Sequence, residues 1–390
     1  MVVIARQTIF RFFILCNYLL VIGQSKTIRY VNNTNANSRI NNDDEQVAKK
    51  PFTLRDIYLQ TYRATGFNGT WISDTEIMVT NIIKSNITVY DVVTKKTKLV
   101  FDGSTLPKQY KFSSATFSAN EQYILFGYDN KQVFRHTTVG KYVVFDVKRN
   151  TFEKIADEAL IAFVLWSPNG SDLVYVHDND IYHMIFNHGH TVVRRLTESG
   201  KSGVVYNGIP DWVYEEEVFA STTAMWYSPD GQYLAFATFN DTVVKDMAYF
   251  YYGVPGSFEN QYPTQVKLKY PKAGTPNPEV SLAVIDLNDP SSKAIILEAP
   301  VDVVGSDNIL FTVSWWDRTH VIATWTNRVQ NQSQLIMYDV QSNTNRSVLY
   351  DEEIEGWLQP NRPIRVGDYA LILRWEDSGI DAGKFRHIDR

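Results

Sequence analysis

From Pro51 onward, short runs of apolar β-branched and aromatic residues alternate with polar turns rich in Asn, Asp, Gly and Pro. Alternation over such short runs is typical of β-strands with one buried face. Two kinds of run recur. The first has an aromatic residue, a small polar turn and an alternating apolar strand, as in FSANEQYILFGYD, WSPNGSDLVYVHD and YSPDGQYLAFATF, which begin at residues 117, 166 and 227. The second has a strand ending in an aromatic residue or Ile and then Asp, a polar turn and a return strand, with copies beginning at residues 87, 142, 282 and 335.

The two kinds of run alternate with a period of roughly 50 residues, the size of one four-stranded propeller blade. We therefore predict an all-β chain, a β-propeller over residues 51–390 with about five blades and the start of another at VGDYALILRWED. A generic β-sandwich is the alternative, which the repeated SPxG turns and Tyr-Asp strand ends disfavour. The longest interruptions are expected at 185–220 and 241–280, and such loops on a rigid scaffold often carry binding groups.

The N-terminal 50 residues have a different composition. MVVIARQTIFR carries two arginines and no acid, and a short apolar run, FFILCNYLLVIG, follows it. This pattern is typical of a cleaved signal peptide, here over residues 1–25, and the run is short for a membrane span. Residues 26–50 are polar and Asn-rich, so we expect a flexible lead-in. The prediction is a secreted protein, with a single-pass type II membrane anchor as the alternative.

The cysteine content and the glycosylation acceptors agree with export. The only cysteine, Cys16, lies inside the predicted signal. The mature chain would then have none, which excludes a cysteine nucleophile and thiolate metal sites. N-x-[ST] sequons are weak signals singly, but their spread along this chain predicts a glycoprotein. They begin at Asn32, Asn68, Asn86, Asn169, Asn240, Asn331 and Asn345.

The net charge and the spacing of the histidines bear on two further kinds of function, nucleic-acid binding and metal binding. The formal net charge of −5 argues against binding nucleic acid by neutralising phosphates. HMIFNHGH holds three histidines, His183, His188 and His190. Their spacing matches no usual zinc pattern, and an alternating strand with a turn explains them better. We therefore predict neither a metal nor a cofactor.

The stretch DWVYEEEVF, residues 211–219, holds three consecutive glutamates between aromatic residues. Asp211 is a candidate cap for a short helix here. Successive helical residues point about 100° apart, so two of the three carboxylates can converge on one ligand. Such a pair repels unless a cation lies between its members, and a primary ammonium with three donors suits it well. The alternative interpretation is an acidic helix turn that faces solvent. A calcium site is disfavoured, because the acidic residues here do not have the EF-hand spacing.

DWVYEEEVF resembles the double-Glu motif of the dipeptidyl peptidase IV family, within the prolyl oligopeptidase superfamily. Other stretches resemble family segments too: NKQVFRH at 130, YNGIPDW at 206, YPKAGTPNPEV at 270 and TLRDIYLQTYRATGFNGTWISDTEI at 53. The resemblance covers about residues 50–390. It implies an eight-bladed propeller that caps an α/β-hydrolase domain, and homodimers are common in the family.

The resemblance also implies residue roles in a substrate-anchoring loop at 206–221. Glu216 and Glu217 would bind the free N-terminus of a peptide substrate, which limits cleavage to dipeptides, usually with Pro or Ala second. Arg135 would hold a substrate carbonyl and brace the acids. Phe219 would be a pocket aromatic.

Two positions depart from the family pattern. Ala220 stands where the family often has Ser. Asn361, in EGWLQPNRP, is the best alignment for a pocket Phe. Both departures put the fine substrate preference in question.

The family's chemistry needs a Ser on a G-x-S-x-G elbow, followed by Asp and His. The sequence holds no such elbow, because WSPNG and YSPDG are blade turns without the preceding Gly. We expect GKFRHIDR to lie inside a blade strand, with the remaining blades and the hydrolase domain absent. The sequence thus predicts the propeller portion of a secreted serine exopeptidase that acts on peptides with a free N-terminus. The alternatives are a truncated, non-catalytic propeller that binds peptides or partner proteins, and an inert structural propeller.

Overall fold

The structure is a computed structural model, and it describes residues 53–59, 61–62, 67–81, 86–107, 110–187, 190–377 and 383–390. The predicted signal peptide and lead-in, with Cys16 and Asn32, lie outside these residues. The chain divides into two units, Met1–Gly66 and Phe67–Arg390. The first unit contains helix α2 (Leu54–Tyr58), which begins at a capping box. Within the described ranges, no helix is long and apolar enough to cross a membrane.

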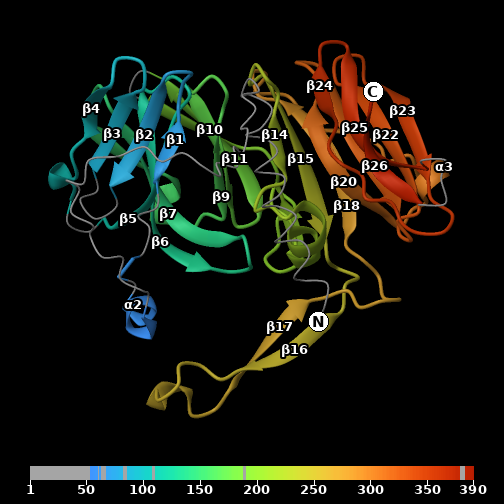
Figure 1. Ribbon diagram of the computed structural model, residues 1–390, viewed down its shortest axis with the longest axis horizontal. Helices are drawn as coiled ribbons and strands as arrows, with labels where there is room; N and C mark the ends of the chain where they lie inside the picture. Colours follow the sequence, from blue (N-terminus) through green and yellow to red (C-terminus); the bar gives the residue numbers. More distant parts are fainter. Residues whose placement is uncertain are drawn as a thin grey trace, which may run out of the picture. The chain divides into compact units, whose positions relative to one another are not determined.

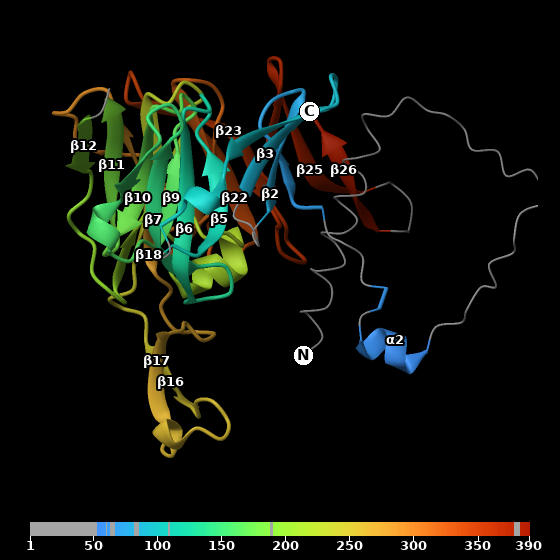
Figure 2. The same cartoon turned by 90° about the vertical axis from the view of Figure 1, so that its left-hand side faces the viewer.

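The second unit is a series of antiparallel sheets, each built from strands that are close in sequence (Figures 1 and 2). Each of the first three sheets pairs four strands in chain order. These strands are β1 (Gly69–Trp71), β2 (Glu76–Asn81), β3 (Asn86–Asp91) and β4 (Lys96–Phe101), then β5 (Phe112–Phe117), β6 (Tyr123–Gln132), β7 (Thr138–Asp146) and β8 (Thr151–Lys154), then β9 (Phe163–Trp166), β10 (Asp172–His177), β11 (Asp180–Asn187) and β12 (His190–Arg195).

The fourth sheet has five strands, because β13 and β14 both pair with β15; the fifth sheet again pairs four strands in chain order, and a three-stranded sheet follows. Their strands are β13 (Val205–Asn207), β14 (Met225–Tyr227), β15 (Tyr233–Asn240), β18 (Glu279–Asp286) and β19 (Ile295–Ile296), then β20 (Asn308–Trp315), β21 (His320–Asn327), β22 (Gln332–Asp339) and β23 (Thr344–Glu352), then β24 (Ile364–Val366), β25 (Tyr369–Asp377) and β26 (Lys384–Asp389). This confirms the predicted propeller of about five blades and part of another.

Short helical segments connect the strands. They are η1 (Gly103–Thr105), η2 (Ala156–Glu158), the π-helix η3 (Tyr214–Phe219), η4 (Phe258–Asn260) and α3 (Val301–Val304). Of these, only η3 carries residues of the predicted site.

The predicted interruption at 241–280 is largely a hairpin, formed by β16 (Asp246–Tyr251) and β17 (Thr264–Lys269). It extends away from the sheets in both views (Figures 1 and 2). The prediction of an interruption at 185–220 was wrong for two segments. HTVVRR, which is β12, pairs with β11 and completes the third sheet, and β13 pairs with β15. The strand interpretation of HMIFNHGH is confirmed at both ends of the stretch: His183 lies in β11 and His190 begins β12, whereas His188 lies outside the described residues.

Neighbouring sheets share their cores, as stacked blades require. Strand β15 shows how the alternation achieves this. Leu234 and Phe236 pack with residues of the third sheet, whereas Ala237 and Phe239 pack with residues of the fifth. One strand therefore contributes to two interfaces because its side chains point to opposite faces.

Leu234→Ala should destabilise the protein by about 2–5 kcal/mol, because the side chain is fully buried between two sheets and leaves a cavity. Denaturant unfolding measures this loss. The matched control is Leu99→Ala on the exposed face of β4, which should change stability by less than about 0.5 kcal/mol. Equal losses in both variants would contradict the shared core.

Candidate functional site

The acidic stretch occupies a gap in the edge strand of the fourth sheet. Both β13 and β14 pair with β15, on different parts of it. Between them, residues 209–223 leave the sheet, whereas the Gly208 N–H and the Ala224 carbonyl still pair with Ala237 of β15. The departure point is Gly208, whose φ of 74° is in the left-handed region and whose added Cβ would lie 2.7 Å from the side chain of Met225. The edge strand therefore continues on both sides of a long excursion.

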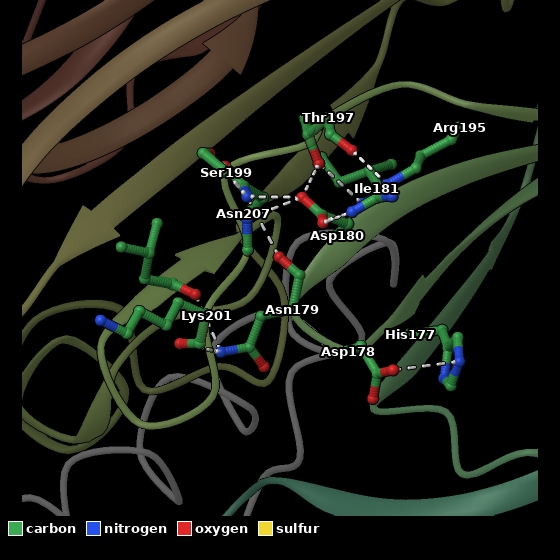
Figure 3. A network of polar contacts seen from close by, with 12 residues as sticks. His177, Asp178, Asn179, Asp180, Ile181, Arg195, Thr197, Ser199, Lys201 and Asn207 are labelled. Atoms are coloured by element: carbon green, nitrogen blue, oxygen red, sulfur yellow. Dashed lines mark hydrogen bonds and ion pairs between the residues drawn. The ribbon is translucent and has the colours of Figure 1, made fainter.

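A network of polar contacts holds the chain just before this departure (Figure 3). The buried carboxylate of Asp180, at the start of β11, accepts hydrogen bonds from the Thr197 hydroxyl at 2.7 Å and the Asn207 amide at 3.0 Å. Its second oxygen pairs with Arg195 at 2.6 Å. Asn207 in turn accepts from the hydroxyl of Thr238 at 2.7 Å. The network joins the third sheet to the end of β13, and the sequence analysis missed it.

The predicted cap at Asp211 is confirmed for the short helical turn at 212–213, which leads into the longer helix. Its carboxylate oxygens accept from the backbone N–H groups of Val213 at 3.1 Å and Tyr214 at 3.3 Å. These are two of the donors that the first turn of a helix leaves unpaired. The helix that follows is η3, a π-helix rather than an α-helix, and Ala220 ends it with a left-handed φ of 49°. Wider π-type turns are rare and frequently occur at functional sites.

Glu215, the first of the three glutamates, points into the protein. It is 0% exposed. One carboxylate oxygen accepts from the backbone N–H groups of His136 at 2.6 Å and Thr137 at 3.1 Å, and the other from the Thr137 hydroxyl at 2.5 Å. These donors lie in the turn between β6 and β7. Glu215 therefore joins the helix to the second sheet.

This contact brings Arg135 beside Glu216. The Arg135 backbone N–H donates to Glu216 at 3.3 Å, and the guanidinium lies 3.7 Å from the other carboxylate oxygen. The Arg135 side chain is 60% exposed and that of Glu216 is 14% exposed. An ion pair so open to water contributes only about 0–1 kcal/mol of stability. Most of the guanidinium remains accessible to a ligand.

Glu217 is the exposed glutamate of the run. Within the described ranges, it makes no hydrogen bond or ion pair with another side chain. Glu216 and Glu217 thus offer carboxylate oxygens from adjacent positions on one helix, beside a cation. The three neighbouring glutamates have three different environments, which their spacing in the sequence did not show.

The predicted pocket residue Phe219 is half-buried and packs mainly inward. Its ring centroid lies 5.5 Å from that of Tyr214, 5.9 Å from that of Trp226 and 6.0 Å from that of Phe239, all edge to face. The hydroxyl of Tyr214 accepts from the backbone N–H of Leu310, in β20 of the fifth sheet, at 3.2 Å. The helix is thus attached to the second, fourth and fifth sheets.

Asn361, the other predicted specificity position, lies between β23 and β24. Its amide donates to the Gln359 carbonyl at 3.1 Å. It lines a cavity of about 230 Å³ together with Asp351, Arg374 and Trp375. Among the residues that the structure describes, it makes no hydrogen bond with the acidic helix.

A second buried acid lies near the cap. The sequence analysis missed it, because it is the middle residue of a sequon and was considered only as part of that motif. Asp241, between Asn240 and Thr242, is 0% exposed. Burial raises the pKa of Asp241, and the nearby charge of Asp211 adds to the effect. Burial likewise raises the pKa of Asp211, against the lowering effect of the helix amides it caps.

The sequons differ in exposure. Asn68, Asn169 and Asn345 are exposed. Asn86, Asn240 and Asn331 are half-buried. The Asn240 side chain accepts from the Thr242 hydroxyl at 2.6 Å and donates to Glu279 at 3.3 Å. As for metals, the described residues contain no cluster of three His, Cys, Asp or Glu side chains that could hold an ion.

Comparison with known proteins agrees with this architecture. The successive four-stranded sheets, with an acidic helix inserted in the fourth, define a β-propeller that presents a carboxylate pair. The sequence model of the family described as "Dipeptidyl peptidase IV (DPP IV) N-terminal region" matches residues 118–388. The chain belongs to this family.

Similar proteins include venom dipeptidyl peptidase 4 of Apis mellifera, 46% identical over 348 residues, which are 89% of this chain and 45% of the relative. Dipeptidyl peptidase 4 of Sus scrofa is 33% identical over 330 residues, 81% of this chain and 42% of the relative. The crystal structure of Porphyromonas gingivalis dipeptidyl peptidase 4 has a TM-score of 0.71 at 22% identity, over 87% of this chain and 48% of that one. The chain spans about half the length of the curated relatives it matches.

Glu215→Ala should destabilise the protein by about 3 kcal/mol, because it leaves three buried donors without their acceptor. Denaturant unfolding measures the loss. Glu217→Ala, two residues further along, removes the same side chain from an exposed position and should cost less than about 0.5 kcal/mol. A Glu215 variant as stable as the Glu217 variant would show that the buried contact is not needed.

Stability should fall as pH rises through neutrality. The folded-state pKa of Asp241, raised to about 8, exceeds the value of about 3.9 expected in the unfolded chain. The folded state therefore holds more protons across this window, and its stability is greatest at the acidic side and is lost as pH rises towards 8. Unfolding midpoints at several pH values should show this slope, and Asp241→Asn should flatten it. An unchanged slope in the variant would contradict the assignment.

Proposed function

We propose that this chain is the substrate-anchoring propeller portion of a secreted dipeptidyl peptidase IV-like serine exopeptidase. In the complete protein it would bind the free N-terminus of a peptide, from which Xaa-Pro or Xaa-Ala dipeptides are removed. The observation that carries the proposal is the grouping of Arg135, Glu216 and Glu217 on a helix fixed by the buried Glu215. The names of the venom and mammalian relatives support the same activity.

The chemistry of the group suits a peptide N-terminus. An ammonium has three donors, and two carboxylates from adjacent positions can accept them. Arg135 offers donors for a carbonyl of the same peptide, at a distance set by its contact with Glu216. If the site holds the peptide's amine at one position, the number of residues between that amine and the bond to be cleaved is constant. Such a site selects exopeptidase substrates.

Cleavage itself needs a nucleophile, a base and an oxyanion hole, and none of the residues described here fills these roles. The proposed role of this chain is therefore binding and alignment. The rival is a propeller that binds peptides or proteins without cleavage. Both hypotheses include the amine site. They differ in whether the complete protein cleaves an Xaa-Pro substrate.

Calorimetry with an Xaa-Pro peptide tests the anchoring role. The free peptide should bind, and its N-acetylated form should bind far more weakly, because acetylation removes the positive charge and two of the donors. Changing Glu216 and Glu217 together to Gln should cost about 1.5–3 kcal/mol for each charged hydrogen bond lost. Equal or absent binding of the two peptides would contradict the proposal.

A control separates the amine site from the fold. Glu259→Gln removes a carboxylate from the distant hairpin segment between β16 and β17 and should leave peptide binding unchanged. Unfolding curves for all variants should coincide, since Glu216 and Glu217 contribute little to stability. A binding loss in the Glu259 variant would indicate a general effect of charge.

We also propose that the protein is secreted as a glycoprotein, in line with the venom relatives. A glycan is expected at the exposed Asn345 rather than at Asn240, whose half-buried side chain donates to Glu279 and accepts from Thr242. In protein expressed through a secretory pathway, Asn345→Gln should remove one glycosidase-sensitive mass step, and Asn240→Gln should remove none. The reverse result would contradict this assignment. The homodimer stays a prediction for the complete protein.

A further inference from the structure

Two buried carboxyl groups, those of Asp211 and Asp241, lie near the beginning of the acidic helix, and the charge of Asp211 acts on Asp241. Asp211 precedes the helix, and Asp241 follows β15 where the chain turns towards the β16–β17 hairpin. Both side chains are almost fully buried. The ring of Trp212, next to Asp211, packs against that of Tyr270, which follows β17 at the base of the hairpin, with centroids 4.6 Å apart. The base of the hairpin and the start of the helix therefore form one packed junction.

The two acids differ in their hydrogen bonds. Asp211 accepts from two helix amides, as described above. The backbone of Asp241 is also paired, because its N–H donates to the Val204 carbonyl at 2.7 Å and its carbonyl accepts from Val244 at 3.0 Å. Its carboxyl oxygens, by contrast, have no hydrogen-bond partner among the described residues. A buried carboxylate in such surroundings would be strongly destabilising.

Few charged groups face this pair. Lys269, on β17, acts on Asp241, but its ammonium already donates to the Val244 carbonyl at 2.8 Å and pairs with Asp246 at 3.3 Å. Tyr206, on β13, faces both acids, and Glu215, on the helix, faces Asp211. Tyr206 and Glu215 bring no positive charge. Two negative charges at this junction would be poorly compensated.

We propose that Asp241 keeps its proton at neutral pH and acts as a positioning residue for the amine site. Asp211 needs a negative charge to cap the helix well, so the proton belongs on Asp241, which caps nothing. With Asp241 neutral, Asp211 holds the start of the helix that carries Glu216 and Glu217. Once Asp241 ionises, repulsion inside a low-dielectric junction opposes the cap and loosens the helix. The consequence for peptide binding rests on the proposed function.

Infrared spectroscopy of the full chain tests where the proton lies, without any ligand. A protonated carboxyl has a C=O band separate from those of carboxylates. The wild-type chain at neutral pH should show this band, and it should disappear on alkaline titration. Asp241→Asn should lack it, whereas Asp246→Asn, a more exposed acid on the same hairpin, should retain it. Absence of the band from the wild-type protein would overturn the proposal, even where the Asn variant fails to fold.

Peptide affinity tests the positioning role. At about pH 6, wild type and Asp241→Asn should bind a free-amine Xaa-Pro peptide with affinities within about twofold. At about pH 8.5, the variant should bind about fivefold more tightly, because its side chain cannot ionise. The peptide's own amine titrates equally for both proteins, so the ratio isolates the effect of Asp241. A ratio that does not change with pH would overturn the positioning role.

The two experiments fail independently. Loss of binding by both proteins at both pH values would overturn the proposed function and with it the link to peptide affinity. The infrared band would still decide whether Asp241 is protonated. A band that persists in Asp241→Asn would assign the proton to Asp211 and overturn the proposal.

Discussion

The carboxylate of Glu215 is the contact on which the candidate site depends. It accepts three hydrogen bonds from the β6–β7 turn, in a place closed to water. A buried carboxylate is stable only when such donors surround it, so the helix and the turn have to stay in register. That register places Arg135 next to Glu216. The accessible charges of the site are therefore positioned by a residue that no ligand would touch.

The excursion that carries this helix is compatible with the propeller because the sheet around it remains intact. β13 and β14 both pair with β15, so the edge position of the fourth sheet stays occupied before and after the excursion. The Asp180 network fixes the chain before the gap, and Tyr214 reaches the fifth sheet beyond it. Contacts with several sheets give the helix little freedom to shift. This rigidity matters for a site that must hold a small charged group.

Burial divides the charges of this region into two sets. Glu216, Glu217 and Arg135 retain contact with water and are available to a ligand. Glu215, Asp211 and Asp241 are enclosed, where each charge needs a donor, a cation or a proton. Glu215 has donors, Asp211 has the helix amides, and Asp241 has neither. The ionisation of Asp241 would act on Glu216 and Glu217 through Asp211, which caps the helix that carries them.

The sequence alone determined the repeat of strands, the propeller class and the Asp211 cap, because these follow from local alternation and from residues a few positions apart. Resemblance pointed to Arg135, Glu216 and Glu217, and the structure brings Arg135 and Glu216 together. Only the tertiary structure gave the three glutamates different environments, turned Phe219 largely inward and buried Asp241. The environment of Glu215 depends on a contact between a helix and a turn that are 79 residues apart in the sequence. Phe219 packs against residues of strands β14 and β15 as well as of its own helix. The burial of these particular side chains depends on how the sheets pack, and no local pattern of residues encodes it.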